Sequence, residues 1–162
     1  MRSSHALLLG LTMLVSTPCH GQAKCPWINE ATARGILGGD VSMTVKLAER
    51  GGGGCEFSRS AGKANLQLSI SIYIMTDVPA QFSKYLEQCP SKSAPLRAIG
   101  NEAVICSLSK GDKYIERVVG RVRDQAFVVS VGSSAVDDPS MTQEMRRKKA
   151  NLIAEQVAGI LF

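Results

Sequence analysis

The sequence predicts a small exported domain of the α+β class, with a mainly antiparallel sheet, helices packed on it and two disulfides. Three observations support this prediction. A short apolar run follows a basic start at the amino terminus. Several later segments alternate apolar and polar residues as half-buried strands do, whereas others have helical spacing. An even number of cysteines follows the amino-terminal run, as in disulfide-bonded secreted domains.

Residues 1–23 have the layout of a secretory signal peptide. Arg2 provides the positive charge, residues 6–15 are mostly apolar, and Gly21 and Ala23 are the small residues that precede a cleavage site. The apolar run is shorter than the roughly 20 residues that cross a bilayer as a helix. We therefore expect a periplasmic or secreted protein in which residues 24–162 form a single domain without a transmembrane segment.

Cys19 raises the alternative of lipidation. A bacterial lipidation site has a small residue immediately before the cysteine and an apolar residue three positions before it, whereas this chain has Pro18 and Ser16 at those places. The sequence therefore favours a soluble mature protein over a lipid-anchored one.

Histidine is absent from residues 24–162, because His5 and His20 both lie in the predicted signal peptide. The imidazole group performs most general acid–base catalysis near neutral pH. Its absence excludes a Ser-His-Asp or Cys-His arrangement and a histidine-ligated zinc site. We expect a non-enzymatic protein without a cofactor or metal; the alternative is an enzyme that uses only carboxylates, serine or lysine.

The first half of the domain predicts one helix and three strands. Asn29 is a capping residue before a helix at 30–37, and the glycines at 38–39 terminate it. The clearest strand is 66–74, in which Leu and Ile alternate with Gln, Ser and Tyr, as in a sheet with one solvated face. Shorter strands are predicted at 41–47 and 55–58.

The second half predicts another helix, three strands and a closing helix. Apolar residues have helical spacing at 80–88, and a short strand follows at 104–108. Residues 113–123 and 126–132 form a predicted hairpin. Ser140 begins a capping-box pattern that opens the last helix. The inward stripe of this helix is expected to be Ala150, Ile153, Val157, Ile160 and Leu161.

Motifs that resemble catalytic or ligand sites have simpler structural explanations. Residues 60–63 and 107–110 have Ser-x-x-Lys spacing, but both segments are predicted to lie at strand ends or turns, where the two side chains diverge. The glycines at 51–54 lack the Lys-Ser/Thr that completes a phosphate loop. Asp137 and Asp138 are expected to cap the last helix, because no further spaced oxygen ligands for calcium accompany them.

The four cysteines after the leader allow three disulfide pairings. A short similarity favours one of them. Cys25 and Cys89 are each followed by proline, and Cys55 and Cys106 each begin a segment of the type Cys-polar-apolar-Ser-basic. This suggests a pseudo-repeat of a helix and three strands, closed by the last helix. We predict Cys25–Cys55 and Cys89–Cys106, each worth about 3–4 kcal/mol, while the other pairings stay open.

Two groups of basic residues are candidate contacts for an anionic partner. The first group lies on one predicted strand at odd-numbered positions and therefore shares a face; it consists of Arg117, Arg121 and Arg123. Four consecutive cations near the start of the last helix oppose its dipole, a local cost that fits either a functional surface or a solvated face. An anionic envelope component or an acidic protein suits such surfaces, whereas nucleic acid does not, because few aromatic residues accompany the charges. The four cations are Arg146, Arg147, Lys148 and Lys149.

The order of elements resembles a family of small exported bacterial domains of unknown function, many of them lipoproteins. It is also similar to the extracellular sensor domains of some bacterial receptor serine/threonine kinases. The resemblance includes Cys25 before the first helix, the segments 55–57 and 100–103, the hairpin and the closing helix. It implies a Cys25–Cys55 bond and a protein that binds rather than catalyses. We therefore expect an extracytoplasmic binding or protein-interaction module; an inhibitor or accessory subunit of an envelope complex is a further alternative.

Overall fold

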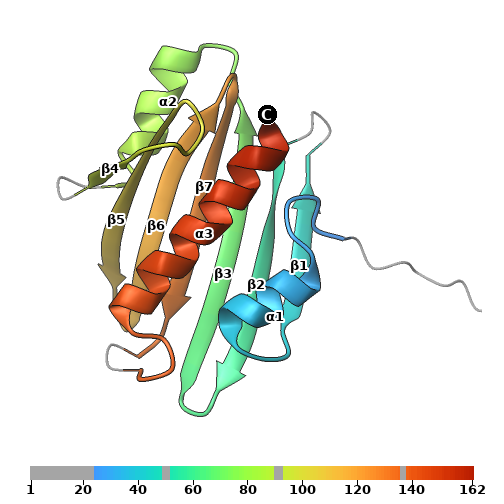
Figure 1. Cartoon of the computed structure of the whole chain (residues 1–162), viewed down its shortest axis with the longest axis vertical. Coiled ribbons are helices and arrows are strands. Elements are labelled where there is room, and N and C mark those ends of the chain that lie inside the picture. Colours follow the sequence, from blue (N-terminus) through green and yellow to red (C-terminus); the bar gives the residue numbers. More distant parts are fainter. Residues whose placement is uncertain (1–23, 49–51, 90–92, 136–137) are drawn as a thin grey trace, which may run out of the picture.

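The computed structural model describes residues 24–48, 52–89, 93–135 and 138–162, so the predicted signal peptide and Cys19 lie outside the described residues. Three helices and seven strands are present in this part of the chain (Figure 1). In chain order they are α1 (Glu30–Leu37), β1 (Ser42–Leu47), β2 (Gly53–Ala61), β3 (Ala64–Ile74), α2 (Val78–Leu86), β4 (Ala94–Leu96), β5 (Glu102–Lys110), β6 (Lys113–Val122), β7 (Gln125–Ser133) and α3 (Gln143–Leu161).

The strands form one antiparallel sheet in the order β1-β2-β3-β7-β6-β5-β4, which confirms the predicted α+β class. The two meanders β1-β2-β3 and β5-β6-β7 meet where β3 pairs with β7 at the centre. The predicted order of a helix and three strands, twice, followed by a last helix, is therefore present with β4 added. No described helix has the combined length and apolar character needed to cross a bilayer.

The helices lie on opposite faces of the sheet because strand residues alternate between the faces. On β6, Val118 and Val122 belong to the main core with α1 and α3, whereas Val119 belongs to a second cluster with α2. Helix α3 runs diagonally across the sheet and α1 covers the β1–β3 side, as Figure 1 shows. Helix α2 covers only one end of the opposite face.

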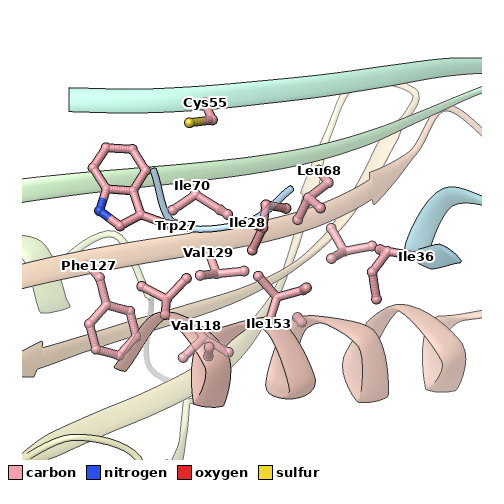
Figure 2. Packing of buried hydrophobic residues seen from close by; sticks show 14 of the residues in the cluster. Trp27, Ile28, Ile36, Cys55, Leu68, Ile70, Val118, Phe127, Val129 and Ile153 are labelled. Carbon is pink, nitrogen blue, oxygen red and sulfur yellow. The ribbon is translucent and has the colours of Figure 1, made fainter. Parts of the chain in front are cut away.

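The main core lies between one face of the sheet and two helices, with α3 packed on β6 and β7 and α1 packed on β2 and β3. Leu68, Ile70 and Val129 are fully buried, and Val129 of β7 lies near Ile153 of α3 (Figure 2). Burial of such a side chain stabilises the fold by about 1.5–3 kcal/mol. The alternation of β3 predicted from the sequence therefore supplies one wall of the core directly.

One glycine in the core provides space for an aromatic ring. Gly120 of β6 lies opposite Phe127 of β7 in the register. A Cβ atom at Gly120 would meet the Phe127 Cζ atom at 2.3 Å. The ring is fully buried and therefore packs directly on the backbone of β6.

Local sequence explains the two ends of α1. The Asn29 side chain accepts a hydrogen bond from the Thr32 amide at 2.8 Å, as expected of a cap. Gly38 adopts the left-handed conformation with φ of 79°, and its amide donates to the Arg34 carbonyl. The Arg59 guanidinium donates to the Leu37 carbonyl at 2.7 Å, which places a cation at the negative end of the helix.

Both predicted disulfides are confirmed. Cys25–Cys55 joins the segment before α1 to β2, and Cys89–Cys106 joins the end of α2 to β5. Trp27, two residues after Cys25, is 4% exposed and belongs to the main core, where Figure 2 shows it. The second disulfide lies in the smaller cluster with Phe82 of α2. One disulfide thus fixes the start of α1 on one face of the sheet, and the other fixes the end of α2 on the opposite face.

Several strand boundaries differ from the prediction. β2 extends beyond 55–58 because it pairs with β1 on one side and β3 on the other, so ladder hydrogen bonds include residues of poor strand propensity such as Gly53. β4 was not predicted; it has three residues and pairs only with β5. Arg123 lies beyond the end of β6, in the turn before β7, with φ of 53°.

The predicted start and inward stripe of α3 were partly wrong. Thr142, rather than Ser140, is the cap residue, because its side chain accepts from the Met145 amide at 3.3 Å. Asp138 does not cap the helix; its carboxylate accepts from the amide and hydroxyl of Ser140 in the preceding turn, and Asp137 lies outside the described residues. Ile160 is 51% exposed. The buried apolar positions are Ala150, Ile153, Ala154, Val157 and Ala158.

Candidate binding surface on the open face of the sheet

We call the side of the sheet that faces away from α1 and α3, and that α2 leaves uncovered, the open face. It is formed by the alternate positions of the strands whose neighbours point into the main core. Short polar side chains predominate there on β1, β2 and β3. The open face includes Ser42, Thr44, Lys46, Glu56, Ser58, Gln67, Ser69, Ser71, Lys113, Arg117 and Ser130.

Arg117 is a half-buried cation on this face. Its Nε atom donates a hydrogen bond to the Ser130 hydroxyl at 3.1 Å. Desolvation by burial lowers the pKa of Arg117, and nearby Tyr73 has a smaller effect in the opposite direction. None of the ion pairs in the described part of the chain includes this guanidinium. Arg117 therefore bears a desolvation cost with a single neutral side-chain partner, and an incoming anion would offset that cost.

Arg121 shares the face of Arg117, as predicted, but its charge already has partners. Its Nε atom lies 3.4 Å from the Glu102 Oε2 atom. Its guanidinium carbon also lies 5.7 Å from the centre of the Phe82 ring, a cation–π distance.

The prediction that Arg123 joins this face was wrong. Its left-handed backbone conformation places it in the β6–β7 turn, where its amide donates to the Asn101 side chain at 2.7 Å. The structure brings together only two of the three predicted arginines.

The four cations of α3 do not form one surface, because successive helical residues point in different directions. Arg146 is only 3% exposed, and its guanidinium donates to the Met141 carbonyl at 2.6 Å. Lys149 donates to the carbonyl of Ile36 at 2.5 Å and so supports the end of α1. Desolvation, and secondarily Arg59, lower the pKa of Lys149.

The other two cations of α3 are engaged with carboxylates. The Arg147 guanidinium lies 3.5 Å from the Glu116 Oε2 atom. The Lys148 ammonium lies 2.8 Å from the Glu144 Oε1 atom, in an exposed pair four residues apart. A continuous anion-binding surface at 146–149 is therefore incorrect, and these residues mainly hold α3 in place.

Glu116 is a buried polar residue that the sequence analysis did not identify. It is 1% exposed and lies on the α3 side of β6. Its Oε1 atom accepts from the Ser107 hydroxyl at 2.5 Å and from the Gln143 amide at 3.2 Å. A hollow of about 540 Å³ adjoins this group at the start of α3. The bonds show that Glu116 fastens the first turn of α3 to the sheet.

Two of the shallow hollows on the open face include residues of β1, β2 and β3, and Arg117 lines neither of them. One of about 370 Å³ is lined by residues that include Ser58, Gln67 and Lys113. The other, of about 230 Å³, is lined by residues that include Thr44 and Ser69. Glu56 lines both hollows. Short hydroxyl side chains leave these depressions between longer amide, carboxylate and cationic groups.

Side chains of this face already hydrogen-bond to one another. The Gln67 amide donates to the Glu56 carboxylate at 2.6 Å. The hydroxyls of Ser42 and Ser58 lie 2.7 Å apart. These bonds orient the polar groups and leave each with further capacity, since a carboxylate or hydroxyl accepts more than one hydrogen bond.

The alternation of apolar and polar residues in 66–74 predicted a solvated face of the sheet, and the kinds of polar residue on that face were the signal for a binding surface. The polar positions of 66–74 are Gln67, Ser69, Ser71 and Tyr73, so none of them has a charged side chain. Among the described residues, no group of three or more histidine, cysteine or acidic side chains is arranged to hold a metal ion.

In comparisons with known proteins, no family model and no curated protein matches this chain.

Proposed function

We propose that this protein is a non-enzymatic, extracytoplasmic binding module that takes an anionic group of its ligand at Arg117 on the open face. The observation that supports this most directly is the half-buried guanidinium with one hydroxyl partner, Ser130, at 3.1 Å. Arg121 and Lys113 add positive charge to the same side of the sheet, and Glu102 partly offsets it.

The absence of histidine from residues 24–162 argues against the usual acid–base enzymes. The two disulfides are typical of exported proteins and support action outside the cytoplasm. Shallow hollows with several polar side chains favour ligand recognition by hydrogen bonds and charge rather than enclosure of a substrate.

The proposal is tested by titrating heparin, as a general polyanion, into the purified protein at increasing sodium chloride. Binding should weaken steeply with salt, because the Debye length falls from about 10 Å at 0.1 M to about 3 Å at 1 M. Arg117→Gln should weaken binding about tenfold or more, since a hydrogen bond to a charged group contributes about 1.5–3 kcal/mol.

Lys148→Gln is the matched control, because it also removes one positive charge but lies on the exposed side of α3, away from the open face. Its affinity for heparin should stay within about twofold of the parent protein. Arg121→Gln should have an intermediate effect, since Glu102 already neutralises part of that charge. Equal weakening by Arg117→Gln and Lys148→Gln, or the absence of salt-sensitive binding, would overturn the assignment to Arg117.

A further inference from the structure

We infer that the ligand of the open face is an acidic oligosaccharide whose carboxylate binds Arg117 and whose neutral sugar units lie over Ser69 and Glu56. This inference rests on the proposed function and specifies the ligand class. It depends on one row of residues that crosses five neighbouring strands.

The register places these residues directly beside one another. Arg117 of β6 pairs with Ser130 of β7, which pairs with Ser69 of β3. Ser69 pairs with Glu56 of β2, and Glu56 pairs with Thr44 of β1. At a strand spacing of about 4.8 Å, the row extends roughly 14 Å from the backbone at Arg117 to the backbone at Glu56. This span is long enough for a short oligosaccharide.

The chemistry of the row changes along its length. The row begins with the Arg117 cation and the Ser130 hydroxyl, which is 8% exposed and accepts from Arg117. The Ser69 hydroxyl, the Glu56 carboxylate and the Thr44 hydroxyl follow, and Glu56 also accepts from the Gln67 amide. Hydroxyls, amides and carboxylates together provide the mixture of donors and acceptors that sugar hydroxyl groups need. Glu56 lines the same hollows as Lys46 and Lys113, so opposite charges lie close together there and favour neutral, hydroxyl-rich units, whereas Arg117 favours the anionic group.

A peptide fits this surface less well. Extended peptides commonly bind by adding a strand at a sheet edge, where backbone groups are unpaired. Ser69 and Ser130 lie on β3 and β7, which are paired on both sides in the middle of the sheet. Only side chains are available to the ligand here, and most of them are small hydroxyl or amide groups.

The test compares three probes by NMR titration of the purified protein. The first is aldotetraouronic acid, a neutral xylotriose with one glucuronic acid unit. The second is xylotetraose, which lacks the carboxylate. The third is an acetylated and amidated Gly-Gly-Gly-Glu peptide, which has one carboxylate and no sugar. We expect the acidic sugar to bind at least about tenfold more tightly than either other probe, an amount equal to about 1.4 kcal/mol.

Two variants separate the anion contact from the sugar contacts. Arg117→Gln should weaken the acidic sugar about tenfold and make it resemble xylotetraose. Gln67→Ala should weaken the acidic sugar several-fold without changing the response to the peptide, because Gln67 is remote from Arg117 in the register. Thermal unfolding of each variant checks that the fold is retained.

The outcomes distinguish this inference from the proposed function. If the peptide and the acidic sugar bind with equal affinity and both depend on Arg117, the sugar inference is overturned and the anion site stands. If xylotetraose binds as well as the acidic sugar, the placement of the carboxylate at Arg117 is overturned. If none of the probes binds and heparin binding is also absent, both proposals are wrong.

Discussion

Removal of the Cys25–Cys55 bond should destabilise the protein by an amount set mainly by chain entropy. The two cysteines are 30 residues apart in sequence. The chain-entropy relation for a loop of this size gives about 3.6 kcal/mol at 25 °C, compared with about 3.1 kcal/mol for the 17-residue separation of Cys89–Cys106. The first value is a large fraction of the total stability of about 5–15 kcal/mol that is typical of a single domain.

The measurement is equilibrium unfolding in urea of the parent protein and the Cys25→Ala/Cys55→Ala variant. Trp27 provides a fluorescence signal beside the bond, because it is the only tryptophan and is buried. Far-ultraviolet circular dichroism reports on the sheet as a whole. We expect both signals to show a loss of about 3–4 kcal/mol and a larger dependence on urea, since an uncrosslinked unfolded chain exposes more surface.

The Cys89→Ala/Cys106→Ala variant is the matched control, since it removes a bond of similar size from the other face of the sheet. It should lose a comparable amount of stability without a specific change at Trp27 in the folded state. A loss below about 1 kcal/mol for the Cys25–Cys55 bond, with unchanged urea dependence, would refute the chain-entropy argument for this protein.

Substitutions at three further positions test the packing and the buried polar groups. Gly120→Ala should lower the unfolding free energy by about 1–3 kcal/mol in urea, because its Cβ atom would displace the buried Phe127 ring; no loss would show that the ring moves freely. Glu116→Ala should cost about 1–3 kcal/mol and Glu116→Gln less, because glutamine keeps an acceptor for Ser107; equal losses would contradict this role. The hydrogen bond from the Ser140 hydroxyl is the largest cause that lowers the pKa of Asp138 below its ordinary 3.8. The ionised carboxylate therefore stabilises the fold above that pH, and this stabilisation is lost as the pH falls through the folded-state pKa. The stability difference between the parent and Asp138→Asn should therefore shrink between about pH 6 and about pH 2, and a constant difference would contradict the assignment.

Local patterns were sufficient for most of the secondary structure. The bounds of α1 were predicted because its cap and its terminating glycines adjoin it in sequence. β3 was predicted because the nine residues 66–74 alternate regularly, and all of their apolar positions except Ile74 are buried. β4 was missed since three residues, one of them Pro95, contain too little pattern to indicate a strand, and its existence depends on pairing with β5.

The roles of the basic residues could not be predicted in the same way. A strand pattern places Arg117 and Arg121 on one face, but only the folded chain places Glu102 beside Arg121 and Ser130 beside Arg117. Similarly, the consecutive charges at 146–149 suggested one surface. In the helix, successive side chains point in different directions, so Arg146 binds a buried carbonyl, Arg147 and Lys148 each lie near a carboxylate, and Lys149 binds the end of α1.

The sequence by itself determined the α+β class, the alternation of the main strands and the supply of four cysteines for two disulfides. It also determined that residues 24–162 have no imidazole group. The tertiary structure decided which face each helix covers, which cations have partners, and that small polar side chains from separate strands form one open face. The periodicity of apolar residues and the capping of helices depend on near neighbours in the chain. Burial and charge pairing depend on residues brought together from distant segments, such as Glu116 and Gln143.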